Sequence, residues 1–167
     1  HYEESAAPGY YKVRLADEDI TAELSATTRV GIHRYTYPER ASRNILLDLD
    51  HSSQKGSWDR KIIQSQIRQT GPNTIEGYRV ITGWAKLRKV YFVAEFSEPI
   101  QNLAITDGGQ PRRNATVVNG RDLKAWMNFG QGRRDVTVKV ALSGVSAENA
   151  RQNLAAEAAG WKFDDYV

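Results

Sequence analysis

Apolar and polar residues alternate along most of this chain with the two-residue period of β-strands. In residues 19–26, Ile20, Ala22 and Leu24 alternate with threonine, glutamate and serine, which predicts a strand with one buried face. The run 88–97 shows the pattern most strongly, with valine, phenylalanine and alanine on one face. The pattern therefore predicts a protein made mainly of β-strands.

Further runs of the same kind are separated by turns at intervals of roughly 8 to 12 residues. The predicted strands cover residues 10–15, 19–26, 28–37, 44–50, 61–69, 74–85, 88–97, 102–107, 123–129 and 135–142. We expect 44–50 to be a central strand, 107–120 to be a long loop, and the last two strands to form a hairpin. Gly77 and Gly83 interrupt their strand, which indicates bulges or a close approach of two backbones.

The period changes near the end of the chain, where one helix is predicted. Ser146 is placed to cap this helix, and Glu148 lies in the first turn, where the helix dipole favours a negative charge. Gly160 is expected to end the helix. Four residues form a narrow apolar stripe along it: Ala147, Ala150, Leu154 and Ala158. Short strands followed by a single helix, without crossover helices, predict an all-β antiparallel sandwich with a C-terminal helix.

Composition adds limits rather than a function. The chain has 167 residues, enough for one domain with its own core, and 23 basic residues against 20 acidic ones. These charges are spread along the sequence and do not cluster as a nucleic-acid surface requires. No run reaches about 18 apolar residues, so no transmembrane helix is expected. The absence of cysteine excludes disulfides, a thiol nucleophile and Cys-ligated zinc. The chain starts at His1 without Met, and we expect it to be a fragment of a longer protein.

No catalytic constellation follows from spacing alone. The histidines at positions 1, 33 and 51 are far apart and match no zinc motif. Glycoside hydrolysis needs two carboxyl groups across a sugar. Five carboxylates lie on or beside predicted strands, where a solvent-facing position is the expected one: Glu23, Asp48, Asp50, Glu76 and Glu95.

Aromatic residues suggest carbohydrate binding, because sugar rings stack on tryptophan while arginine and histidine hold hydroxyl groups. Trp58 lies in a polar stretch and Trp84 follows a glycine, so these two are the candidate sugar platforms. Arg29 and His33, on the segment 28–37, are the candidate hydroxyl-binding residues. The other two tryptophans, at positions 126 and 161, are expected to pack in the core or at an interface.

Four blocks of the sequence resemble a known family. They are PGYYKVRL at 8–15, ITAELSATTRVGIHRYTYP at 20–38, GWAKLRKVYFVAEFSEPI at 83–100 and VKVALSGVSAENARQNLAAEAAGWKFD at 138–164. In this order they resemble the N-terminal domain of the calcium-dependent exo-α-mannosidases, glycoside hydrolase family 92. The four blocks span nearly the whole chain and are far longer than a short motif.

The resemblance implies a fold similar to the galactose-mutarotase-like supersandwich, here incomplete because the family's earlier N-terminal portion is absent. It implies a division into a sandwich at 1–145 and, at 146–167, a helix that starts the interdomain linker. In the family an (α/α)₆ barrel follows and supplies the general acid, the base and the Ca²⁺ ligands. No catalytic residue or metal ligand is therefore expected in this chain, and the fragment alone is expected to be inactive.

The resemblance also implies the activity of the parent protein: hydrolysis, with inversion, of terminal α-linked mannose from N-glycan-type mannosides. Its partners would be α-mannoside glycans and the catalytic barrel of the same polypeptide. The location would be the periplasm, the cell surface or the medium. Unpaired sheet edges in an incomplete sandwich would favour self-association. Two alternatives stay open, a stand-alone carbohydrate-binding module and an aldose epimerase-like enzyme on the same fold.

Overall fold

The computed structural model describes residues 3–51, 62–83, 85–113 and 115–167, and two sequence-predicted site residues, Trp58 and Trp84, lie outside this part of the chain. The strands of the described part are β1 (Glu4–Ala7), β2 (Tyr10–Leu15), β3 (Ile20–Ala26), β4 (Val30–Thr36), β5 (Asn44–Asp48), β6 (Ile62–Gly71), β7 (Thr74–Ile81), β8 (Arg88–Phe96), β9 (Asn102–Asp107), β10 (Gln110–Arg112), β11 (Val117–Gly120), β12 (Leu123–Asn128) and β13 (Asp135–Ser143). They are followed by the helix α1 (Ala147–Glu157) and a 3₁₀ turn, η1 (Phe163–Tyr166). The predicted all-β class with one C-terminal helix is confirmed.

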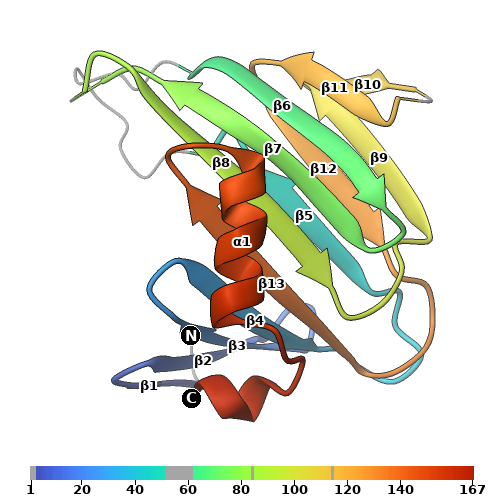
Figure 1. The fold of residues 1–167 in the computed structure, drawn as a ribbon. Helices are drawn as coiled ribbons and strands as arrows, with labels where there is room; N and C mark the ends of the chain where they lie inside the picture. Colours follow the sequence, from blue (N-terminus) through green and yellow to red (C-terminus); the bar gives the residue numbers. More distant parts are fainter. Residues whose placement is uncertain (1–2, 52–61, 84, 114) are drawn as a thin grey trace.

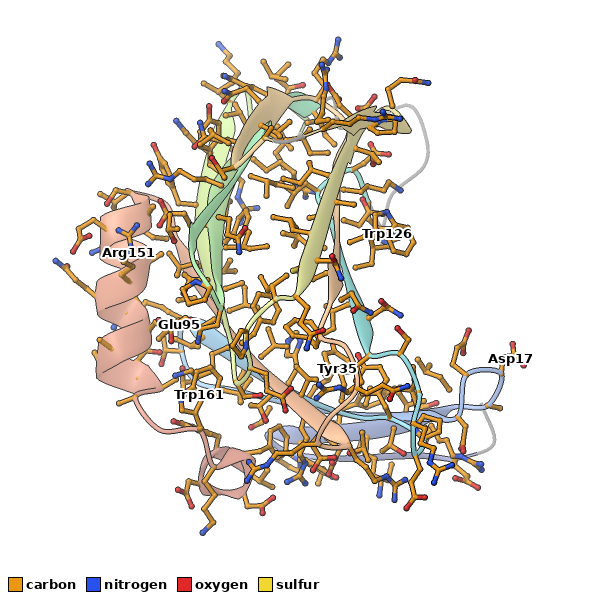
Figure 2. The ribbon with its side chains drawn as sticks, turned by 90° about the vertical axis from the view of Figure 1, so that its right-hand side faces the viewer. Asp17, Tyr35, Glu95, Trp126, Arg151 and Trp161 are labelled. Carbon is orange, nitrogen blue, oxygen red and sulfur yellow. The ribbon has the colours of Figure 1, made fainter. Side chains whose placement is uncertain are left out.

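The strands form two antiparallel sheets (Figure 1). The larger sheet has nine strands in the order β1-β2-β3-β4-β13-β8-β7-β6-β11, and the smaller has four in the order β10-β9-β12-β5. Figure 2 shows the layers from the side, with α1 on one face of the large sheet and the small sheet on the other. Among the described residues, no helix is long and apolar enough to cross a membrane.

The main core fills the space between the two sheets, as alternation predicts. The strand β8 sends Phe92, Ala94 and Phe96 into this core, where they meet side chains of β12 such as Met127. The rings of Phe96 and Phe129 lie 5.2 Å apart, centre to centre. Along each strand of a sandwich, residues that face this core alternate with residues that face outward. The two-residue period of the sequence therefore predicts the residues of this core best.

A second, smaller core lies under α1 on the opposite, outer face of the large sheet. The helix contributes the predicted apolar stripe, with Ala150, Leu154 and Ala158 buried against Ile32 and Val93 of the sheet. The helix is eleven residues long, too short to be stable alone, so this packing holds it in place.

The ends of α1 are set in different ways. The Ser146 hydroxyl accepts a hydrogen bond from the Asn149 N–H at 3.0 Å, which confirms the predicted N-cap. The expected stop at Gly160 is wrong, because the helix ends at Glu157 with Ala158 as its C-cap. The buried Lys139 of β13 donates to the Ala158 carbonyl at 2.9 Å, so the sheet beneath satisfies the end of the helix.

Three predictions about the strands are corrected. The segment 107–120 is not a plain loop, because it contains β10 and β11. The strands β12 and β13 form no hairpin: β12 pairs with β5 and β9 in the small sheet, whereas β13 pairs with β4 and β8 in the large one. The strand β5 is an edge strand of the small sheet, not a central one. Alternation defines which side of a strand is buried but not which sheet the strand joins.

Gly77 is explained by the close approach of two backbones. A Cβ atom at this position would lie 1.8 Å from the carbonyl oxygen of Gln66 on the neighbouring strand β6. The irregularities in the pairing of β6 with β7 lie elsewhere, between Ile62 and Gln64 and between Gln69 and Gly71. Of the two roles expected for this glycine, close approach is the one observed.

Candidate functional site

Arg29 lies in the turn between β3 and β4 and reaches toward the helix. Its guanidinium pairs with Glu157 of α1 at 2.5 Å, and its backbone N–H donates to the same carboxylate at 2.9 Å. The Thr27 hydroxyl donates to Glu157 as well, at 2.6 Å. These bonds hold the pKa of the Glu157 carboxyl below its usual value, with the Thr27 hydrogen bond as the largest cause. Arg29 thus has an evident role in holding α1.

His33 lies on β4 but on the other face. Its cross-strand neighbours are Leu24 and Val138, and Val138 belongs to the core between the sheets. The Nδ1 atom of the ring lies 3.0 Å from the Tyr35 hydroxyl, and burial lowers the pKa of the imidazole. The hydrogen-bond partner of the ring is therefore the Tyr35 hydroxyl group. Tyr35 lies in the angle between the β1–β4 part of the large sheet and the small sheet (Figure 2).

The structure consequently does not bring Arg29 and His33 together, since they serve opposite faces of the large sheet. Their proposed contacts with substrate stay predictions.

A polar cleft lies elsewhere, at the end of the large sheet below α1. Its volume is about 880 Å³. Thr137 and Ser97 form its floor, where the Ser97 hydroxyl accepts a hydrogen bond from the Thr137 N–H at 3.0 Å. The C-terminal residues 161–164 line one wall, and the loop before β13, with Arg133 and Arg134, lines another.

The wall formed by the C-terminal residues is held by a network around Arg34. This side chain donates to both carboxylate oxygens of Glu23, at 2.7 and 2.9 Å, and to Asp164 at 3.0 Å. Its guanidinium also lies over the Phe163 ring, 4.6 Å from the centre. The bonds from Arg34, and one from the Tyr10 hydroxyl, lower the pKa of the Glu23 carboxyl against the opposing effect of burial.

Trp161 completes this wall. The Lys139 ammonium group lies 3.9 Å from the centre of a Trp161 ring, while 38% of the Trp161 residue remains exposed. Lys139 also approaches Glu95 at 3.5 Å, and burial lowers the pKa of its amine although Glu95 opposes this. Figure 2 shows Trp161 and Glu95 on the same side of the large sheet.

The opposite wall is fixed by Arg43, which is 2% exposed. Its guanidinium donates to the carbonyl oxygens of Phe129, Gly130 and Arg133, at 2.7, 3.1 and 2.9 Å. It also pairs with Glu98 at 2.7 Å. A buried guanidinium with this many partners holds the loop that carries Arg133 and Arg134 in one conformation.

Sequence reasoning missed this cleft because its residues come from four separate segments and share no motif. Two of the carboxylates expected to face solvent are in fact buried: Glu23 is 8% exposed and Glu76 is 2% exposed. Trp126, expected to pack in the core or at an interface, does not lie in the core, because it is 51% exposed on the outer face of the small sheet (Figure 2). Trp161 was expected to pack and does so in part, against Lys139.

The described residues hold no cluster of three or more histidine, aspartate or glutamate side chains that could bind a metal ion. The carboxylates of the cleft, Glu98, Asp135 and Asp164, come with four basic side chains around them. This arrangement offers many hydrogen-bond donors and acceptors, and it suits the binding of a polar ligand.

The family of the chain follows from comparison with known proteins. The family model of the glycosyl hydrolase family 92 N-terminal domain matches residues 1–143. The chain belongs to this family, and its fold is that of the N-terminal domain. No curated protein sequence matches the chain.

Solved structures of members of this family have the same fold as the chain. The family GH92 α-mannosidase BT3965 from Bacteroides thetaiotaomicron superposes with a TM-score of 0.89 at 33% identity, over 99% of this chain and 23% of that one. The GH92 family glycosyl hydrolase ccman5 gives 0.84 at 26% identity, over 99% and 23%. The inverting mannosidase BT2199 of the same Bacteroides species shares the fold, with a TM-score of 0.78 at 23% identity over 96% and 21%. The chain thus spans less than a quarter of each of these proteins.

Proposed function

We propose that this chain is the N-terminal domain of an exo-α-mannosidase that removes terminal α-linked mannose with inversion of configuration. The observation that carries the proposal is the match of 99% of the chain to a family α-mannosidase with a TM-score of 0.89. A second structure of that relative holds mannoimidazole, and another family member is described as an inverting mannosidase. The domain would form one wall of the active site, and the catalytic domain of the same polypeptide would supply the acid and the base.

Calcium belongs to this proposal as an ion held by the catalytic domain. That this chain itself supplies no calcium ligand remains part of the proposal. N-glycan-type mannosides are the proposed substrates, and the periplasm, the cell surface or the medium is the proposed location.

The test compares the intact polypeptide with the 167-residue chain on an aryl α-mannoside and on mannobiose. The intact protein is expected to release β-mannose first, as proton NMR of the fresh product would show, and to lose activity with a calcium chelator. The 167-residue chain is expected to release none. α-Mannose as the first product would exclude inversion, and turnover by the chain alone would contradict its role as one wall of a shared site.

A stand-alone carbohydrate-binding module is the second candidate, favoured by the polar cleft with Trp161 at its wall. It differs in one measurable way: the intact polypeptide would bind mannosides but release no mannose from them. Release of mannose by the intact polypeptide would argue for the mannosidase domain instead.

A further inference from the structure

We propose that the cleft between residues 161–164 and the loop before β13 binds neutral hexose units of the oligosaccharide substrate, away from the bond that is cleaved. This inference rests on the proposed function. The sugar subsite consists of Trp161, Arg133 and Asp135, which surround Thr137 at the floor of the cleft.

The size and shape of the cleft can accommodate a small carbohydrate. Ligand-binding clefts commonly enclose roughly 300 to 1,000 Å³. The cleft, at about 880 Å³, falls in this range and is open on one side, as a chain that continues beyond the bound unit requires.

The charges favour a neutral ligand over an anion. Four basic side chains, Arg34, Arg133, Arg134 and Lys162, and three acidic ones, Glu98, Asp135 and Asp164, line the cleft. Several of these charges are already neutralised, because Arg34 pairs with Glu23 and Asp164, Glu98 pairs with Arg43, and Lys162 pairs with Asp165. Within the described part of the chain, the lining charges left without such a pair are those of Arg133, Arg134 and Asp135, so the cleft offers many donors and acceptors with a small net positive charge, which suits hydroxyl groups.

Trp161 supplies the apolar part of the site. Sugar rings present C–H groups that pack on an indole ring. The Lys139 ammonium, 3.9 Å from a ring centre, fixes the plane of this indole from one side. Trp161 lines the cleft and remains 38% exposed. Its indole ring therefore offers a sugar a stacking surface beside the polar floor.

Both walls are held by hydrogen bonds within the chain in the absence of ligand, which limits the entropy lost on binding. Lys139 is tied to the Ala158 carbonyl at 2.9 Å, and Arg43 holds the opposite loop through three carbonyl oxygens. By contrast, Trp126 is more exposed but lies on the outer face of the small sheet, and it does not line this cleft. Trp126 is therefore the matched control for Trp161.

The first experiment titrates the 167-residue chain with mannotriose and follows the indole and backbone N–H signals by NMR. The expected result is saturable shifts of the Trp161 indole and of the Thr137 amide in the millimolar range. Measured at the Thr137 amide, the affinity should fall at least tenfold in Trp161→Ala and stay unchanged in Trp126→Ala. Because Trp161→Ala also removes a partner of Lys139, Arg133→Ala is the second variant, with an expected three- to tenfold loss. No saturable shift at Trp161, or shifts centred on Trp126, would overturn the proposal. Tighter binding of mannose 6-phosphate than of mannotriose would identify an anion site and overturn it as well.

The second experiment separates this proposal from the proposed function. In the intact protein, Trp161→Ala is expected to raise KM for mannotriose several-fold and to leave KM for an aryl α-mannoside unchanged, because the aryl substrate has no second sugar. An equal change for both substrates would contradict the subsite. Failure of the unaltered intact protein to cleave either substrate would contradict the proposed function, whereas the titration would still decide whether the cleft binds sugar.

Discussion

The two faces of the large sheet are both covered, but by different chemistry. The inner face meets the small sheet through an apolar cluster, with Ile67, Phe92 and Val136 among its members. The outer face meets α1 through a smaller apolar cluster, and charged groups are buried beside it, among them Glu76 and Lys139. The face that packs on another sheet is thus mostly apolar, whereas on the face that receives a short helix, buried polar contacts fix the position of that helix.

These polar contacts act at both ends of the helix. Glu76, on β7, pairs with Arg68 of β6 and with Arg151 of α1. At the other end, Arg29 pairs with Glu157. Hydrophobic packing has no direction, so such paired groups give the helix its position along the sheet.

The largest effect is expected from Phe129→Ala in the inner core. Phe129 is 1% exposed, and its loss leaves a cavity beside Phe96. We expect the free energy of unfolding to fall by about 3–5 kcal/mol, measured by urea denaturation. The control is Trp126→Ala, an aromatic removed from the exposed side of the adjoining strand, with an expected loss of about 1 kcal/mol or less. Similar losses for the two variants would contradict the assignment of the main core.

A smaller effect is expected from Glu76→Gln on the outer face. Removing the buried charge leaves Arg68 without its ion-pair partner and Arg151 with Glu148 alone, but the two arginine side chains are 45% and 38% exposed and can be hydrated. We therefore expect a loss of about 2 kcal/mol, below the usual cost of breaking a buried ion pair.

Hydrogen exchange sharpens this comparison. In Glu76→Gln the amides of α1 should exchange faster, because the ion pair between Arg151 and Glu76 joins the helix to β7. The amides of β12, in the other sheet, should keep their protection. Equal acceleration in both elements would show that the two faces unfold together and that the ion pair does not anchor the helix locally.

The same contrast explains what the sequence could predict. All ten predicted strands are present, because each buries one face in a core and so alternates. The three strands that were missed, β1, β10 and β11, lie at sheet edges, and nearly all their residues are exposed or half-buried. Edge strands of this kind form mainly through backbone hydrogen bonds to one neighbouring strand. Such bonds do not require apolar residues at alternate positions, so the sequence pattern does not reveal these strands.

The cleft was beyond sequence reasoning for a related reason. Arg34 and Asp164 are 130 residues apart in the chain and meet only because the C-terminal turn folds back on β4. The expectation that Glu23 faces solvent failed for the same reason, since η1 covers the polar side of β3: the Ser25 hydroxyl contacts the Tyr166 carbonyl. The resemblance to the family predicted the fold and the proposed activity, but it did not predict where a cleft would lie.

Glu23→Gln tests the polar network beneath η1 through its pH dependence. The pKa of Glu23 is lowered by its hydrogen bonds to Arg34, so its charged form stabilises the folded state. This contribution is complete above the ordinary pKa of 4.5 and is lost as the pH falls through the lower pKa of the folded protein.

We therefore expect Glu23→Gln to cost about 1–2 kcal/mol near pH 7 and progressively less as the pH falls below 4.5 and through the lowered pKa of the folded protein. Urea denaturation at a series of pH values measures this decrease. A cost that does not change with pH would mean that Glu23 acts through packing and not through its charge.

The smallest effect is expected from Ser146→Ala at the start of α1. The variant loses the bond from the Asn149 N–H to the Ser146 hydroxyl, which satisfies one of the free donors of the first turn. The expected loss is about 1 kcal/mol, and Ser146→Asp should restore it because aspartate caps as well as serine. The apolar stripe and the contacts of Glu76 and Glu157 remain, so faster hydrogen exchange should be confined to the first turn. If the whole helix became unprotected, the N-cap would be as important to docking as the ion pairs, and the outer face would depend on local helix stability after all.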